Sequence, residues 1–197
     1  MTNAGRAEMT AATCSKDLCP AAGRTPRGVV ATTQALSGIL GDDADLLITA
    51  AWLHDIGYSP ALAATGFHPL DGARYLRDAE HASELVCRLA AHHSCAINEA
   101  AERGLADALL CALGPPPDDL ADALIYCDMT TGPDGQAMAA DQSGSDLSGP
   151  QDGDTSTRLL GLCSEYRASS ETAVTGVLPG FGAHGYGLAG IGPSCTC

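Results

Sequence analysis

Residues 50–58 of the chain read Ala-Ala-Trp-Leu-His-Asp-Ile-Gly-Tyr, and this stretch decides the fold. Apolar residues lead into it from Leu46 at steps of three and four, which is the spacing of one buried helix face. Gly57 ends that helix, so His54 and Asp55 occupy its last turn. Because neighbouring helical residues point about 100° apart, both side chains reach one site only near such a helix end.

The same helical pattern recurs in blocks on either side of this stretch. Asp42-Asp43-Ala44-Asp45 supplies capping carboxylates for the first helix, and a second opens at His68-Pro69, with proline in its first turn. Further helices are expected around residues 85–93, over 97–110 and from Asp118 through Asp128. No segment alternates apolar and polar residues. The sequence therefore predicts an all-α fold, a compact bundle of several helices.

Composition divides the chain into three zones. Residues 1–25 are small and polar without a sustained period, which predicts a flexible, disordered N-terminal arm. Residues 26–140 form the helical domain. Beyond it the chain turns to Ser, Gly, Asp and Thr, and this part holds 11 of the 23 glycines. We therefore expect residues 141–197 to be a linker and a Gly/Ser-rich tail, with a short helix over 158–167.

The chain is strongly acidic, with 10 Lys and Arg against 24 Asp and Glu and a formal net charge of -14. Such a surface repels phosphate backbones and anionic headgroups, which argues against a nucleic-acid polymer or a membrane as partner. Lys16 is the only lysine, which argues against Schiff-base and phosphate-loop enzymes. A phosphorylated substrate would need local cations or metal ions to be held.

The sequence also predicts the cellular compartment of the protein and the redox state of its cysteines. No stretch approaches the roughly 20 apolar residues that cross a bilayer, and the first residues lack the basic-then-apolar pattern of a secretory signal. The nine cysteines are odd in number and irregularly spaced, and Cys87, Cys111 and Cys127 lie in apolar helical runs, where a thiol is usually a buried hydrophobe. We therefore expect a reduced, cytoplasmic protein.

Several segments of the helical domain carry an imidazole or a carboxylate next to an apolar helix face. Besides His54-Asp55, these are His68, His92-His93 and Asp128. Such ligands hold Mn, Fe, Co, Ni or Mg, whereas a thiolate-rich zinc site would need paired cysteines. The pattern favours a divalent metal site. Structural alternatives stay open, since His68 could cap its helix and one of the paired histidines could only orient a neighbour.

These residues resemble the HD-domain superfamily of metal-dependent phosphohydrolases, especially its small stand-alone members, over roughly residues 24–135. His54-Asp55 is similar to the defining doublet of the family, and Asp128 to its distal aspartate. His68 and His92-His93 resemble the additional histidines of branches that bind two metals. The resemblance implies one or two divalent ions bridged by Asp55, with His54 and Asp128 on the first and His68 with one or both of the paired histidines on the second.

The resemblance further implies hydrolysis of a small phosphorylated molecule, such as a nucleotide, by metal-activated water, with His54 and Asp55 as the catalytic residues. It does not identify the substrate-binding residues or the oligomeric state.

One family feature is missing. Members usually carry a further metal-binding histidine upstream of the doublet, whereas the first histidine of this chain is His54, and Thr25 or a neighbour occupies the expected place. Activity could survive on fewer ligands, or water or His184 could fill the gap. Alternatively, the domain could be a catalytically impaired metal- or ligand-binding module. A di-iron oxygenase that cleaves carbon–phosphorus or carbon–carbon bonds is a further alternative.

Overall fold

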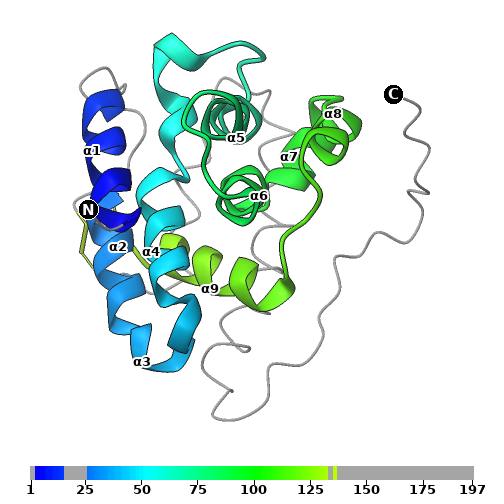
Figure 1. The fold of residues 1–197 in the computed structure, drawn as a ribbon. Coiled ribbons are helices and arrows are strands. Elements are labelled where there is room, and N and C mark those ends of the chain that lie inside the picture. The colour runs from blue at the N-terminus through cyan, green and yellow to red at the C-terminus, as the bar shows by residue number, and fades with distance from the viewer. Residues whose placement is uncertain (1–2, 16–25, 133–134, 137–197) are drawn as a thin grey trace.

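The computed structural model describes residues 3–15, 26–132 and 135–136, and these residues form helices and connecting turns without any β-strand (Figure 1). The α-helices are α1 (Asn3–Ser15), α2 (Pro26–Ala35), α3 (Ser37–Leu40), α4 (Ala44–Leu53), α5 (His68–Asp78), α6 (Glu84–His92), α7 (Ala96–Glu102), α8 (Ala106–Ala112) and α9 (Asp118–Met129). Short 3-10 turns are η2 (Gly41–Asp43), η3 (Ile56–Tyr58) and η4 (Pro60–Leu62). The expected all-α fold is confirmed.

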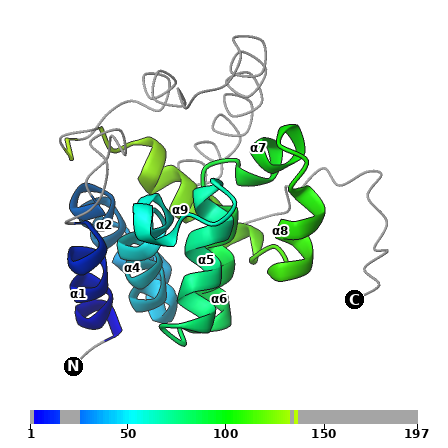
Figure 2. The ribbon, with the colours of Figure 1, turned by 90° about the horizontal axis from the view of Figure 1, so that it is seen from above.

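Helix α4 lies at the centre of the packing, in contact with α1, α2, α6 and α9 (Figure 2). It is apolar around most of its circumference, which is the pattern of a fully buried helix. Leu47, Ala50 and Ala51 belong to a core shared with α2 and α9. Leu53 belongs to a second core shared with α1, α5 and α6. The segment that ends in His54 and Asp55 is thereby held from several sides.

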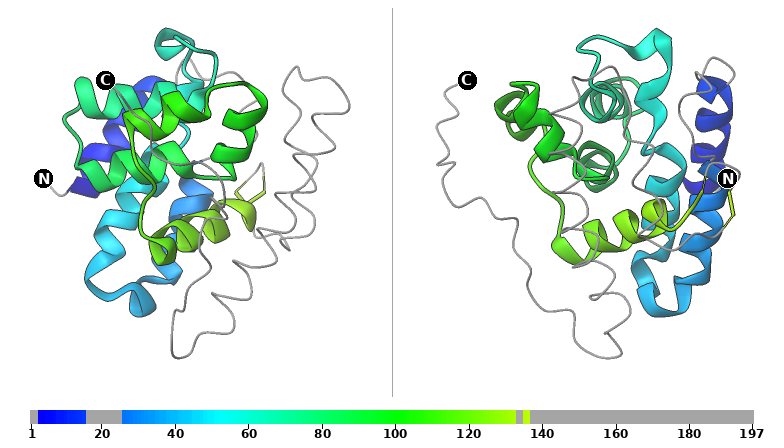
Figure 3. Two further views of the ribbon diagram at one scale, coloured as in Figure 1. Left: turned by 90° about the vertical axis from the view of Figure 1, so that its right-hand side faces the viewer. Right: turned by 180° about the vertical axis from the view of Figure 1, so that it is seen from behind.

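Helices α5 and α6 pack side by side and are seen end-on in Figure 1. A loop joins the end of α5 to the start of α6, where the Ser83 hydroxyl accepts a hydrogen bond from the Val86 amide at 3.4 Å. Helix α9 contacts α2, α4 and α6, and Figure 3 shows it from two further sides. This packing brings the C-terminal ends of α4 and α6 to the N-terminal end of α5.

The prediction of an unstructured N-terminal arm is wrong for residues 3–15. These residues form α1, and Ala7 and Ala11, one turn apart, are buried in the core beside α4 and α5. An alanine face allows a helix to approach its neighbours closely but gives a weak apolar signal in the sequence. Residues 16–25, the linker and tail beyond 140, the expected helix over 158–167 and His184 lie outside the described residues.

The single helix expected over residues 97–110 is two helices, α7 and α8. Gly104 separates them with a φ of 68°, in the left-handed region where glycine has no steric penalty. The carboxylates expected to cap α4 do not do so. Asp42 and Asp43 lie in η2, and Asp43, the N-cap residue of α4, makes no side-chain hydrogen bond to the helix. At α9 the N-cap residue Pro117 makes no side-chain cap either, and Asp119 accepts a hydrogen bond from the Leu120 amide at 2.9 Å within the first turn.

The cysteines agree with the expectation only in part. Cys87 and Cys127 are buried free thiols, and burial raises the pKa of Cys127 to about 11. Cys111 instead is exposed on α8, so it is not a buried thiol. Within the described ranges, the longest helix has 13 residues, and none has the length and apolar character of a membrane span.

Candidate metal centre

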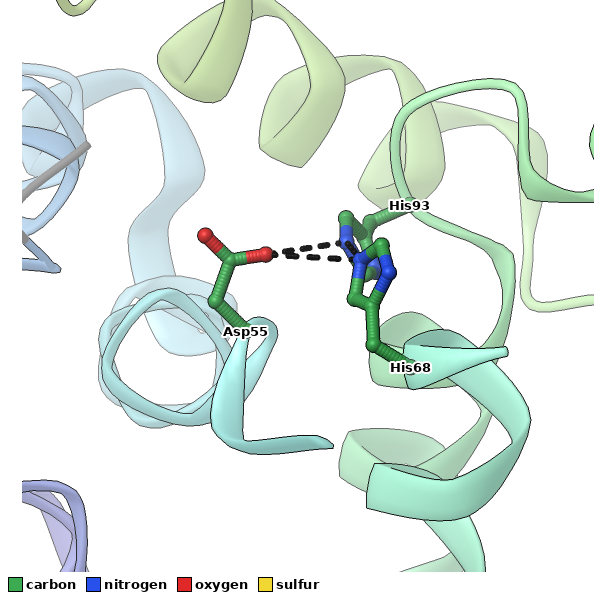
Figure 4. Close-up of side chains that lie close together, drawn as sticks. All are labelled: Asp55, His68 and His93. Carbon is green, nitrogen blue, oxygen red and sulfur yellow. Dashed lines mark hydrogen bonds and ion pairs between the residues drawn. The ribbon is translucent and has the colours of Figure 1, made fainter. Parts of the chain in front are cut away.

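Asp55 lies between two groups of side chains and directs one carboxylate oxygen at each. Its Oδ2 is 3.3 Å from Nε2 of His54. Its Oδ1 is 3.3 Å from Nε2 of His93 and 3.6 Å from Nε2 of His68, as the dashed lines in Figure 4 show. The two carboxylate oxygens therefore face different imidazoles that come from different helices.

Each group of side chains contains one further close contact. On one side, His54 Nε2 is 3.5 Å from Oδ1 of Asp128, which lies on α9. On the other side, the Nε2 atoms of His68 and His93 are 3.2 Å apart. One ligand atom from each of Asp55, His68 and His93 lies within 4.8 Å of the other two. We call His54, Asp55, His68, His93 and Asp128 the metal-site cluster.

The turn after α4 explains how adjacent residues His54 and Asp55 reach one place. His54 caps α4 with helical dihedrals, whereas Asp55 has a φ of -96° and a ψ of 8° and leads into η3. Gly57 in η3 then lies directly against the first turn of α5, where a Cβ would overlap the His68 carbonyl oxygen and lie 2.7 Å from the Gly72 nitrogen. This backbone contact places His68 beside Asp55.

Backbone carbonyls orient two of the imidazoles. His54 Nδ1 is 2.9 Å from the Ala51 carbonyl oxygen, and His93 Nδ1 is 2.7 Å from that of Ala90. Since a carbonyl only accepts, each Nδ1 carries a proton and donates it, and each Nε2 is turned toward the cluster. This arrangement fixes the tautomer of metal-binding histidines in proteins.

The electrostatics of His54 indicate a place for a cation. Burial lowers the pKa of His54, but the carboxylates of Asp55 and Asp128 outweigh burial and hold this pKa well above its ordinary value. Its Nε2 is fully buried and faces both carboxylates, at 3.3 Å and 3.5 Å. Two carboxylates therefore favour positive charge at this atom, and either a proton or a metal ion supplies it.

The other side of the cluster favours neutral imidazole. Burial lowers the pKa of His68 to about 3, with a further lowering from His93, so His68 is uncharged at neutral pH. For Asp55, burial acts to raise the pKa, but His54 and His93 outweigh it and hold the carboxyl ionised. Neutral imidazole and ionised carboxylate are the protonation states that bind metal ions. A divalent metal ion thus fits the donor set.

Among the candidate ligands that the structure describes, His92 is the one that does not reach the cluster. Its Nε2 is 2.8 Å from the carbonyl oxygen of Leu113, in the segment between α8 and α9. Burial lowers its pKa, so the ring is neutral and Nε2 donates to that carbonyl. Adjacent residues at the end of α6 point in different directions, and only His93 faces Asp55. His92 thus joins α6 to the segment before α9.

Residues that the sequence did not single out support the cluster. The Ser94 hydroxyl donates a hydrogen bond to Oδ2 of Asp128. Ser94 and Cys95 have φ values of 49° and 62°, a left-handed pair in which side-chain-bearing residues are uncommon. Such strain persists where the surrounding structure holds it, and it often marks functional sites. Here it turns the chain after His93 so that Ser94 reaches α9.

Tyr58 and Asp71 hold the segment around His68. The ring of Tyr58 stacks on His68, with centroids 3.7 Å apart and planes 15° apart. The buried Asp71 carboxylate accepts hydrogen bonds from the amides of Ala64, Thr65 and Gly66, at 3.0 to 3.1 Å. Asp71 follows His68 by three residues, but no periodicity of the sequence reveals that its carboxylate organises the preceding loop.

Replacing Ser94 with alanine is expected to weaken Co²⁺ binding about tenfold, because losing a hydrogen bond behind a metal ligand typically costs 10- to 100-fold. Isothermal titration of the metal-stripped full chain measures this affinity. Ser83→Ala is the matched control, since it removes a serine that caps α6 away from the cluster. Ser94 would have no positioning role if its variant bound Co²⁺ like wild type, or if the control lost as much.

The comparisons with known proteins agree with this geometry. A family model described as HD domain matches residues 25–128, which is more than half of the 197 residues. No curated protein and no solved structure matches the chain. The matched span begins at Thr25, ends at Asp128 and includes the whole metal-site cluster.

Proposed function

The chain belongs to the HD domain family, and we propose that it hydrolyses a phosphoester of a small molecule with one or two divalent metal ions. Members of this family are typically metal-dependent phosphohydrolases of small phosphorylated substrates. One observation carries the proposal: Asp55 points one oxygen at His54 and the other at His68 and His93. A carboxylate placed in this way can hold two cations side by side.

In this proposal the cluster divides into two ligand sets that share Asp55. His54, Asp128 and Oδ2 of Asp55 would hold one ion, and His68, His93 and Oδ1 would hold the other. A divalent ion in such a site lowers the pKa of water and offsets charge on phosphoryl oxygens. The ionised Asp55 and the neutral His68 are ready to bind without first losing a proton.

The protein's own residues also shape how a substrate reaches the site. Tyr58 stacks on His68 and remains 39% exposed, so its ring forms part of the accessible edge of the cluster. The chain carries a net charge of -14, which opposes the approach of a phosphate. In this proposal, recognition of the phosphate depends on the metal ions, and Tyr58 contacts the remainder of the substrate.

A metal-dependent activity panel tests the proposed function. The full chain is stripped with a chelator, reloaded separately with Mn²⁺, Co²⁺, Ni²⁺ or Mg²⁺, and assayed on phosphomonoesters and phosphodiesters, including nucleotides. We expect turnover that appears on reloading and disappears on chelation. If no substrate is hydrolysed with any of these ions, or if hydrolysis is unaffected by chelation, the proposal fails.

A second candidate function is a weakened or non-catalytic metal-binding module, and the absence of any histidine before His54 favours it. Thr25 precedes α2 directly, and α2 packs against α4 and α9, which lead to His54 and carry Asp128. In this proposal an imidazole at position 25 supplies the ligand that the resemblance to the family places upstream of His54.

Thr25→His is accordingly expected to raise Co²⁺ affinity about tenfold or more, the scale of one added ligand interaction of 1.4 kcal/mol. Ala31→His, on the exposed face of α2, is the matched control and should leave affinity unchanged. Equal affinity in Thr25→His and wild type would mean that the site is not missing a ligand there. Higher metal affinity with new turnover would identify the wild-type chain as the weakened form.

A further inference from the structure

A hollow lies beside α4, between α1 and the segment that joins α5 to α6. It has a volume of about 310 Å³ and is bounded by one face of α4 from Asp45 to Leu53, the end of α5 and the start of α6, with α1 along one side. The cluster residues instead lie at the end of α4, the start of α5 and the end of α6. Leu53 directly precedes His54, so the two places approach each other at the end of α4, but none of the cluster residues lines the hollow.

The floor of this pocket is apolar. Leu46 and Leu53 come from α4, Leu76 from α5 and Val86 from α6. Leu53, Leu76 and Val86 also belong to the core that α1 closes. A volume near 300 Å³ is at the lower end for small-molecule pockets, which are mostly apolar with a few polar groups. The size fits a compact organic molecule rather than a bare ion.

The mouth of the pocket is acidic. Asp42, Asp45 and Glu80 line it, together with the guanidinium of Arg6 and the exposed imidazole of His81. Glu80 is already engaged, with the Tyr75 hydroxyl at 2.7 Å and Arg6 at 3.8 Å. Asp42 and Asp45 are exposed, and neither has an ion pair with any of the described residues. The rim therefore carries two uncompensated carboxylates above an apolar floor.

We propose that this pocket binds a small organic amine, whose ammonium group pairs with Asp42 and Asp45 while its apolar body lies against the half-buried Leu46, above the buried side chains of Leu53, Leu76 and Val86. The charges complement each other, and the ammonium keeps contact with water at the rim, so the cost of removing it from solvent is small. The same carboxylates repel a phosphorylated molecule. The occupant is therefore chemically different from the substrate proposed for the metal centre.

A matched series of ligands tests the proposal on the full chain. Hexylamine, 1-hexanol and hexanoate share an apolar body and differ in head-group charge, and ammonium chloride supplies the charge alone. By isothermal titration at neutral pH we expect hexylamine to bind about tenfold more tightly than hexanol, the effect of two exposed ion pairs. Hexanoate should bind more weakly than hexanol, and ammonium should show no saturable binding.

A double variant links this binding to the pocket. Asp42→Asn combined with Asp45→Asn should lower the affinity for hexylamine to that for hexanol. Neither side chain caps a helix, so the double variant is expected to fold. Asp107→Asn is the control, because it removes an exposed carboxylate from the first turn of α8. Equal affinity for all three hexyl ligands, equal affinity for ammonium and hexylamine, or a double variant that still prefers hexylamine would each overturn the proposal. None of these outcomes depends on hydrolysis at the metal centre.

Discussion

Replacing Asp55 with asparagine is expected to lower metal-dependent turnover by at least about 10³-fold, equivalent to roughly 4 kcal/mol of transition-state stabilisation. Asparagine keeps the size of the side chain and one carbonyl oxygen. It removes the negative charge and the second oxygen, so His54 and the pair His68 and His93 no longer share a carboxylate. Two cations held nearby would then repel each other without an intervening anion.

The measurement is turnover at saturating metal, on whichever substrate the activity panel identifies. Asp45→Asn is the matched control, since it neutralises an exposed carboxylate on α4 at the far end from the cluster and should retain wild-type turnover. Circular dichroism establishes that both variants fold. Wild-type activity in a folded Asp55→Asn protein would contradict the proposed role of Asp55.

Replacing Gly57 with alanine is expected to destabilise the fold by about 3 kcal/mol or more, at or above the upper end of the usual range for overpacking. An added Cβ would overlap the His68 carbonyl oxygen and lie 2.7 Å from the Gly72 nitrogen. All of these atoms belong to the backbone, so no flexible side chain can move aside. The clash would separate η3 from α5 and thereby move His68 away from Asp55.

Chemical denaturation of the full chain measures this loss. Gly38→Ala in α3 is the matched control, because a Cβ there has nothing within 4 Å. In a helix interior, alanine is more favourable than glycine by about 1 kcal/mol of helix stability. The control should therefore be as stable as wild type or slightly more stable. A Gly57→Ala chain with wild-type stability would show that the close approach of η3 and α5 is not required.

The sequence predicts the helices that carry the site because their signals are strong. Helices α4, α5, α6 and α9 combine apolar spacing with clear starts and stops. Helix α1 was missed because its buried face consists of Ala7 and Ala11, which resemble a polar, small-residue segment in composition. The division at Gly104 was missed because a single glycine can also continue a helix, and only its left-handed φ shows the break.

The candidate site was predictable as a set of residue types but not as an arrangement. Nothing in the pair His92-His93 indicates which imidazole faces Asp55, since that depends on where α6 ends and on the Leu113 carbonyl that His92 contacts. The link from Ser94 to Asp128 depends on a left-handed turn that neither serine nor cysteine favours. Both features arise from packing between segments far apart in the chain.

Cobalt titration of the metal-stripped full chain, followed by visible absorption, tests most directly whether the cluster binds metal. We predict saturable Co²⁺ bands for wild type, weakened bands for His54→Ala and His93→Ala, and wild-type bands for His92→Asn, whose imidazole contacts Leu113 instead. Circular dichroism confirms folding of each variant. If His92→Asn loses the bands while folded His54→Ala and His93→Ala retain them, or if wild type binds no Co²⁺, the proposed metal centre is contradicted.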